Sequence, residues 1–172
     1  MKLIKENIRL RAPELEDLEM LYKWENDERI WYLSHTDTPF SRFDLEQFIL
    51  HSNHDIYSEK QYRFMIENTQ DNKLLGCVDL FDFDAKNKRL GLGILIDEKH
   101  RRQGFASKAI DIVVQYSFEQ LDVHQVFCHV LSSNTDSLNL FKRKHFSMIG
   151  VKKDWVYFNK QYQDEVMLQL IK

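Results

Sequence analysis

The sequence is poor in the residues that mark several classes of protein. Its 172 residues include only two cysteines, two prolines and five glycines. The cysteines, Cys77 and Cys128, lie far apart and form no close-spaced motif, so we expect a reducing, cytoplasmic compartment without disulfides. No repeat, low-complexity tract or linker interrupts the chain, which predicts a single domain over residues 1–172.

Long apolar runs and an excess of positive charge are also missing. No stretch approaches the ~20 apolar residues of a membrane span, and residues 1–11 contain no apolar core of a signal peptide. The formal net charge is −3, which argues against a generic nucleic-acid or membrane binder, and we expect neither partner. Hydrophobic residues make up 43% of the chain, enough for a globular domain with a substantial core.

The spacing of apolar residues predicts strands that alternate with helices. The expected strands cover residues 7–11, 62–67, 74–84, 90–96, 123–131, 146–158 and 162–170. The expected helices follow Pro13 and Ser41 and cover residues 107–121 and 134–144. This order predicts an α/β (α+β) fold with a mixed sheet, in which helical crossovers make the parallel part.

Residues 89–106 organise the chain as a buried strand, a basic loop and a helix start. The loop carries Arg101, Arg102, Gln103 and Gly104. Free backbone N–H groups at a helix start bind anions, phosphates in particular, and a glycine allows a close approach. The glycine spacings of the P-loop and of the Rossmann fingerprint are both absent. The loop is therefore a candidate phosphate site, with a solvated turn as the alternative interpretation.

A second motif favours the phosphate interpretation. It reads N-x-x-S-x-x-x-F-x-x-x-x-F from Asn134 and follows the strand at 123–131, while the loop reads R-x-x-G-x-A from Arg101. Together, in this order, the two motifs resemble the GNAT superfamily of acetyl-CoA-dependent N-acetyltransferases. The opening I-R-L-R-x-x-x-x-x-D-L from Ile8 extends the resemblance over nearly the whole chain.

The resemblance implies a single, mostly antiparallel sheet of about seven strands, splayed between the fourth and fifth, with helices on both faces. The opening would admit acetyl-CoA as cosubstrate, held by backbone groups of the fourth strand, by the basic loop and by the second motif. The cosubstrate-binding residues that it implies are Ile94, Leu95, Ile96, Arg101, Arg102, Gln103, Gly104, Phe105, Ala106, Ser107, Asn134 and Phe141.

The implied reaction is direct attack of an amine on the thioester while both substrates are bound. The family uses a backbone N–H in the fourth strand to stabilise the oxyanion, which points to Leu95 here. In many members a tyrosine that acts as the general acid occupies the position of Phe141, and phenylalanine cannot donate a proton. Ser137, on the same helix face, is the replacement candidate, and a serine that only satisfies the helix start is the alternative.

The amine must also lose a proton, because a lysine-like amine has a pKa of roughly 10.4. Asp79, Asp82 and Glu25 are the candidate bases, with solvated surface charge as the alternative for each. Asp79 and Asp82 have opposite parity on one strand, so at most one faces the cleft unless a bulge intervenes. As a set the three acids predict a cationic acceptor.

The sequence thus predicts an N-acetyltransferase that moves an acetyl group from acetyl-CoA to a primary amine. The acceptor is a polyamine or diamine, an amino compound or a protein N-terminus. The alternative, motivated by Phe141, is a catalytically silent acyl-CoA-binding module. No metal is expected, because His51 and His54 lack a third ligand nearby. The sequence does not decide whether the protein forms a homodimer.

Overall fold

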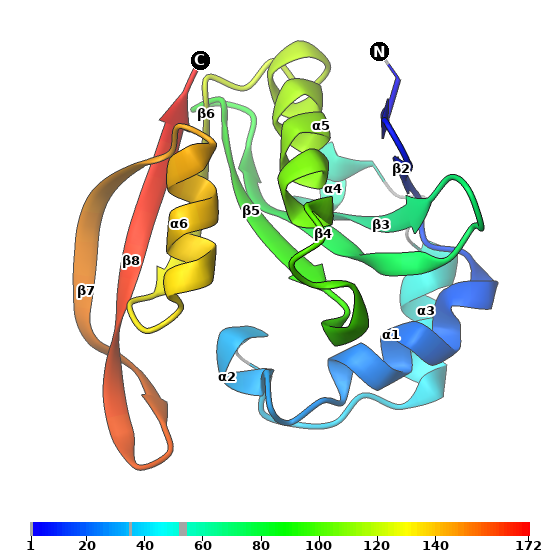
Figure 1. Ribbon diagram of the computed structural model, residues 1–172, viewed down its shortest axis with the longest axis horizontal. Helices are drawn as coiled ribbons and strands as arrows, with labels where there is room; N and C mark the ends of the chain where they lie inside the picture. Colours follow the sequence, from blue (N-terminus) through cyan, green and yellow to red (C-terminus); the bar gives the residue numbers. More distant parts are fainter. Residues whose placement is uncertain (1, 35, 52–54) are drawn as a thin grey trace.

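The computed structural model describes residues 2–34, 36–51 and 55–172. Within these residues it contains one sheet of eight strands in the order β1-β2-β3-β4-β5-β6-β8-β7 (Figure 1). The strands are β1 (Ile4–Lys5), β2 (Ile8–Arg11), β3 (Tyr62–Asn68), β4 (Leu74–Asp84), β5 (Arg89–Ile96), β6 (Gln125–Leu131), β7 (Ser147–Phe158) and β8 (Gln161–Ile171). All neighbouring pairs are antiparallel except β5 and β6, so the predicted mixed, mostly antiparallel sheet is confirmed.

The helices connect and cover this sheet. They are α1 (Leu18–Glu25), α2 (Trp31–Ser34), α3 (Arg42–His51), α4 (Ile56–Glu59), α5 (Phe105–Glu119) and α6 (Thr135–Arg143), with short 3₁₀ turns at Leu15–Asp17 and Glu98–His100. No helix in the described part of the chain has the length and apolar character needed to cross a membrane.

Two small elements were not expected from the sequence. β1 contributes only two residues and pairs with β2, with Ile4 opposite Arg9, which gives eight strands instead of about seven. α4 makes a single turn, with Asp55 as its N-cap. Neither element is long enough to leave a periodic pattern of apolar residues, and such a pattern is the main signal in a sequence.

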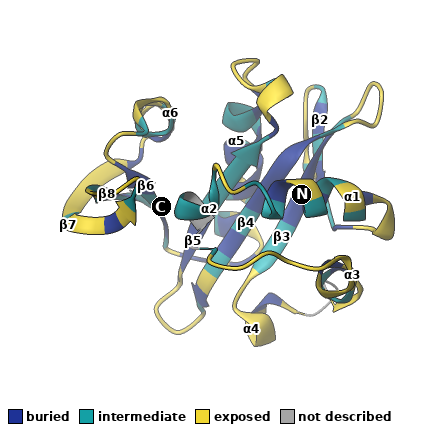
Figure 2. Cartoon of the chain, turned by 90° about the horizontal axis from the view of Figure 1, so that it is seen from below, coloured by how far each residue is buried: buried dark blue, intermediate teal, exposed yellow. Residues whose placement is uncertain are grey.

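Strand parity divides the side chains of the sheet between two cores. Phe64 and Val78 face a large core with α5 and α6, while their neighbours Met65 and Cys77 face a smaller core with α1 and α3. Figure 2 shows α5 and α3 on opposite sides of the sheet. Helices on both faces were predicted, and the alternation of a strand's side chains explains why one strand can serve both cores.

The sheet opens between β5 and β6. These strands pair in parallel only from Arg89 to Gly91, which lie opposite residues 125–127. Beyond that point β5 continues beside β4 to Ile96, and β6 continues beside β8 to Leu131 (Figure 1). The expected splay is confirmed, and it leaves one edge of β5 from Leu92 onward without a partner strand in the described chain.

Candidate functional site

A cavity of about 150 Å³ lies where β5 and β6 separate. One wall comes from β5, and another from the first turns of α6; these walls contain Leu92, Gly93, Ile94, Asn134, Ser137 and Phe141. The structure therefore brings the predicted strand before the basic loop next to the second motif, which lies about forty positions further along the chain. The splay makes this meeting possible, because a continuous sheet would fill the space with paired backbone.

The start of α6 fixes the side chains of the second motif. Asn134 is the N-cap, and its Oδ1 accepts a hydrogen bond from the Ser137 N–H at 3.2 Å. This bond satisfies one of the open donors of the helix start. The Ser137 hydroxyl has no hydrogen-bond partner among the described residues and lines the cavity. Phe141 is buried there and packs edge-on against Phe146.

The backbone of β5 alternates between β4 and the gap. The Asp97 N–H bonds to the Leu75 carbonyl of β4, and alternate residues of an antiparallel pair repeat that direction. Leu95, opposite Cys77, therefore directs its N–H and carbonyl toward β4. Leu92, Ile94 and Ile96 direct theirs toward the gap. This corrects the prediction for Leu95: Ile94, which lines the cavity, offers the N–H in that position.

The basic loop leads from β5 into α5. Arg101 donates from Nε to the Ile96 carbonyl at 3.1 Å, and Gln103 donates to the Lys99 carbonyl at 3.2 Å. Arg102 and Gly104 adopt left-handed conformations, with φ of 61° and 82°. Such turns gather backbone N–H groups into a concave anion site, and glycine adopts them without strain.

α5 begins at Phe105, two residues before its predicted start, with Gly104 as its N-cap. The Phe105 side chain is buried in the large core, whereas residues 101–104 are exposed. Ala106 and Ser107 follow in the first turn. The loop thus combines an anchored helix start with open N–H groups and basic side chains, as an anion site requires.

The basic loop also lies close to α6. Arg102 and Asp136, on the first turn of α6, form an exposed ion pair of 3.5 Å. This ion pair shows that the starts of α5 and α6 lie next to each other.

On the face of the sheet with α1, an ionic cluster links the predicted acids. Arg63 of β3 donates from Nε to Asp79 at 2.6 Å and from Nη2 at 3.0 Å, and its Nη1 bonds to Glu25 at the end of α1. Glu25 and Asp79 are thus brought together. Sequence reasoning missed Arg63, although a charged residue two positions before the buried Met65 was a usable signal.

The ionic cluster has an excess of negative charge, because two carboxylates share one guanidinium. Burial by itself would lower the pKa of Arg63, but the neighbouring charges, Asp79 first and Glu25 with it, raise the pKa well above its usual range. Arg63 therefore stays charged, and the three groups carry a net charge of −1 when both acids are ionised.

Two glycines of β5 have different roles on this face. A Cβ at Gly91 would collide with the Phe81 ring, at 2.2 Å, so Gly91 makes room for packing. A Cβ at Gly93 would make only ordinary contacts, the nearest 3.7 Å away at the Asp79 Cβ. Gly93 pairs with Asp79 and lines the cavity. Because Gly93 has no side chain, it leaves open space in the cavity next to Asp79; we call this position the floor of the cavity.

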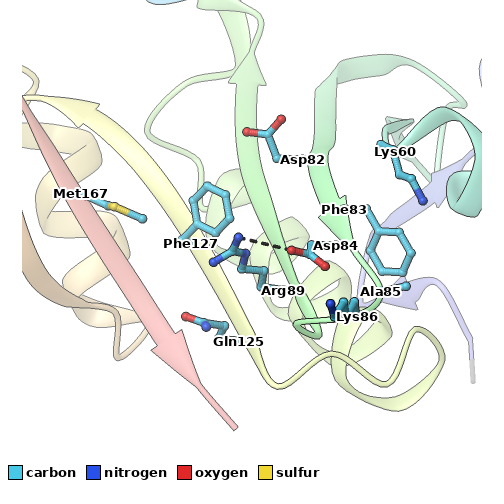
Figure 3. Close-up of a pocket in the computed structure, with 10 residues that line it drawn as sticks. All are labelled: Lys60, Asp82, Phe83, Asp84, Ala85, Lys86, Arg89, Gln125, Phe127 and Met167. Atoms are coloured by element: carbon cyan, nitrogen blue, oxygen red, sulfur yellow. Dashed lines mark ion pairs between the residues drawn. The ribbon is translucent and has the colours of Figure 1, made fainter.

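Asp82 does not join the other acids. The register of β4 and β5 shifts between Phe81 and Asp84, and Asp82 adopts a φ of 49° in this bulge. It lines a second, more open cavity of about 760 Å³ at the β4–β5 hairpin, with an Asp84–Arg89 ion pair of 3.2 Å (Figure 3). The bulge thus separates the two strand acids: Asp79 pairs with Gly93 of the cavity lining, whereas Asp82 lies at the hairpin.

The cavity between β5 and β6 also contains residues outside the predicted set of site residues. Tyr32 of α2, His129 of β6 and Glu165 of β8 line it. The His129 Nδ1 lies 3.4 Å from Glu165 Oε1, and Lys152 Nζ lies 2.7 Å from the same oxygen. Strand parity gave the face of His129, but only the pairing of β6 with β8 brings Glu165 to it.

The described residues contain no group of three or more His, Cys, Asp or Glu side chains that could hold a metal ion. His51 ends α3, whereas His54, the other member of the histidine pair, lies outside the described residues.

Comparisons with known proteins agree with this geometry. Residues 7–147 match the family model of the acetyltransferase (GNAT) domain. The chain is 30% identical to a spermidine N(1)-acetyltransferase of Vibrio cholerae over 159 residues, which are 90% of this chain and 87% of that protein.

Solved structures are also similar. The crystal structure of spermidine N-acetyltransferase from Vibrio cholerae in complex with CoA and spermine has a TM-score of 0.86 and 26% identity, covering 97% of this chain and 96% of that one. A structure described as the dodecameric enzyme of the same organism has a TM-score of 0.81 and 26% identity, with 97% and 95% covered.

Proposed function

Because the chain belongs to the acetyltransferase (GNAT) domain family, we propose that it transfers an acetyl group from acetyl-CoA to a primary amine of a cationic polyamine. The observation that carries this proposal is the cavity in the splay: its lining includes the start of α6, which an ion pair joins to the basic loop, and Gly93, which pairs with Asp79. The basic loop suits the phosphates of acetyl-CoA, and the acids suit a cationic amine.

The chain's own groups fit the acyl donor. The open edge of β5 offers the backbone of Ile94 and Ile96 for strand-like pairing with the pantetheine arm. The N–H groups of residues 101–107 would hold the pyrophosphate at the start of α5. Asn134 and Phe141 lie where the arm would end, so the thioester would reach the cavity that they line.

Two groups are assigned to the acyl transfer itself. The Ile94 N–H, directed into the gap, would stabilise the oxyanion of the tetrahedral intermediate. The Ser137 hydroxyl, which makes no hydrogen bond within the described chain, would protonate the departing sulfur. A thiol with a pKa near 8.5, as in cysteine, leaves readily as a thiolate. Protonation by Ser137 therefore contributes less to the rate than correct positioning of the two substrates.

The acceptor side favours a cation. Glu25 and Asp79 carry two negative charges against the single positive charge of Arg63, and Asp79 borders the open floor at Gly93. A polyamine, with further charged nitrogens beyond the reacting one, matches this surplus better than a protein N-terminus. The similarity to spermidine acetyltransferases supports the same class of acceptor.

The test is release of free CoA from acetyl-CoA with a panel of amines, beside calorimetry of acetyl-CoA binding. We expect release with spermidine or a diamine that exceeds release with a neutral-tailed monoamine or a peptide N-terminus. Ser137→Ala should lower kcat with unchanged affinity for acetyl-CoA. Binding without release for any amine would support the silent module instead, and absence of binding would refute both.

We also propose a cytoplasmic enzyme that self-associates. Cys77 and Cys128 are both free thiols, which is what a reducing compartment favours. The β7–β8 hairpin exposes the apolar side chains of Met148, Ile149, Val151, Trp155, Tyr157 and Tyr162. Exposed apolar side chains of this kind are typical of an interface, and we expect a second copy as the occupant, because a similar protein is described as dodecameric.

A further inference from the structure

We propose that His129, oriented by Glu165, is the catalytic base that removes the proton from the attacking amine. The inference rests on the proposed acetyl transfer and assigns its base, which the sequence placed among Asp79, Asp82 and Glu25. Three observations carry it: the place of His129 in the cavity, its contact with a buried carboxylate, and the occupation of the other acids by Arg63 or by a different cavity.

The first observation is the position of His129 across the gap from Asp79. Asp79 pairs with Gly93, and Gly91 pairs with Phe127 two residues before His129. Parity puts all of these side-chain positions on one face of the sheet. Gly93 is therefore an open floor between a carboxylate on β4 and an imidazole on β6. An ammonium ion over this floor would have a charge partner on one side and a proton acceptor on the other.

The second observation is the partner of the ring. Glu165 is only 5% exposed, and its Oε1 faces the His129 Nδ1 at 3.4 Å. A carboxylate beside Nδ1 favours the tautomer with its proton on Nδ1, which makes Nε2 the basic nitrogen. It also stabilises the imidazolium that forms when Nε2 takes a proton. The distance between a catalytic histidine and the carboxylate beside it commonly shortens when substrates bind.

Two aromatic rings also lie beside His129. Phe127 and Phe81 pack near it, with ring centroids 5.5 and 6.5 Å away. The charged group beyond Glu165 is Lys152 of β7, at 2.7 Å from the same oxygen. Across the floor lies the Arg63–Asp79 pair, and the helices contribute Tyr32 and Ser137 to the cavity. Glu165 is thus the carboxylate next to the ring.

The third observation concerns the acids named from the sequence. Glu25 and Asp79 both accept hydrogen bonds from Arg63, so the guanidinium already occupies oxygens that a base would use to accept a proton. Asp82 belongs to the open cavity at the β4–β5 hairpin. Histidine is the side chain whose ordinary pKa lies closest to neutrality, and His129 is the histidine in the cavity lining.

The step balances as follows. The amine binds over Gly93 as an ammonium ion, and it becomes a neutral nucleophile there by releasing one proton to solvent. As the new C–N bond forms, His129 Nε2 accepts the N–H proton. The C–S bond breaks and its electron pair leaves with sulfur. The proton on His129 then restores the thiol through the Ser137 hydroxyl, so that one amide and one thiol are produced.

The experiment measures steady-state acetylation by the full-length protein with acetyl-CoA and spermidine. His129→Gln should lower kcat by about 100-fold or more, the range of general base catalysis, with acetyl-CoA affinity unchanged within twofold by calorimetry. His124→Gln is the matched control, because His124 is exposed outside the cavity on the segment leading into β6, and it should keep wild-type activity. Imidazole added to His129→Ala should restore part of the lost rate.

Glu165→Gln separates a proton-transfer role from a structural one. Loss of the carboxylate removes the counter-charge of the imidazolium, so the acidic limb of the kcat/KM profile should move to lower pH. A wild-type protein without amine-dependent CoA release would refute the proposed function and this base together. Release by the wild type, with His129→Gln equally active or the profile of Glu165→Gln unmoved, would overturn the base alone.

Discussion

Arg63 supplies the guanidinium that Glu25 and Asp79 share on the inner side of α1. Its side chain is 17% exposed, as is that of Glu25, whereas Asp79 is 36% exposed. Removing one partner of a mostly buried ionic group leaves the other charges without compensation, and this costs more than the group contributes as a whole. The acid pair that we assign to the acceptor therefore depends on a residue of opposite charge.

Replacing this cation tests that dependence. Arg63→Met should lower the free energy of unfolding at pH 7 by about 3 kcal/mol, measured by urea denaturation. Arg42→Met is the control, since Arg42 pairs with Glu19 on the exposed surface, and it should have no measurable effect. Equal losses from the two substitutions would contradict the argument.

Between elements, Asp97 joins the end of β5 to α1. Its Oδ2 accepts hydrogen bonds from Trp24 Nε1 at 2.9 Å and Lys23 at 3.1 Å, and its Oδ1 accepts one from the Lys99 N–H. Burial would raise the pKa of Asp97, but these donors outweigh burial and lower the pKa from 3.8 to about 2. The contact holds α1, with Glu25 at its end, against the turn that leads into the basic loop.

This contact predicts a pH dependence. A carboxyl group whose pKa is lower in the folded state stabilises the fold above its unfolded pKa, and loses that effect as pH falls through the folded value. Asp97 should contribute about 2 kcal/mol at pH 7, and this should decline from near pH 4 to pH 2. Urea denaturation of Asp97→Asn should therefore differ from wild type at pH 7 but converge with it near pH 2. Asp71→Asn, in an exposed turn, is the control, and a pH-independent difference for Asp97→Asn would count against the assignment.

For the whole molecule, the exposed apolar side chains of the β7–β8 hairpin need an explanation. β7 is the last strand of the sheet order, with β8 as its neighbour on one side, and unpaired edge strands promote association. Ile149 and Trp155 are more than half exposed, at 51% and 56%. A second copy that covers this surface would remove both the open edge and the apolar area from water.

The molar mass in solution tests this surface. We expect light scattering to give a mass above that of one chain for the wild type. Ile149→Lys should lower the mass without changing the circular dichroism spectrum. Phe43→Lys is the matched substitution, because Phe43 is 66% exposed on α3, far from the hairpin in sequence, and it should leave the mass unchanged. A monomeric wild type, or a mass that responds only to Phe43→Lys, would rule out the hairpin as the interface.

The sequence by itself determined most of the elements and the places of its two motifs within them. Strand β4 was predicted at its observed bounds, and the two motifs around Gly104 and Asn134 fall at the starts of α5 and α6. These signals are local: a helix start, a left-handed turn or an apolar period is encoded within about ten neighbouring residues. Local coding is also why β1 and α4, which are too short to show a period, were missed.

Only the tertiary structure decided the acceptor side. Arg63 meets Glu25 because β3 lies under the end of α1, and His129 meets Glu165 because β8 returns beside β6. The direction of each backbone group in β5, which replaced Leu95 by Ile94, follows from the register with β4. Pairings between strands far apart in the chain depend on the whole set of packed side chains. These pairings cannot be derived from a single sequence, because a shift of one residue in register moves every side chain of a strand to the opposite face of the sheet.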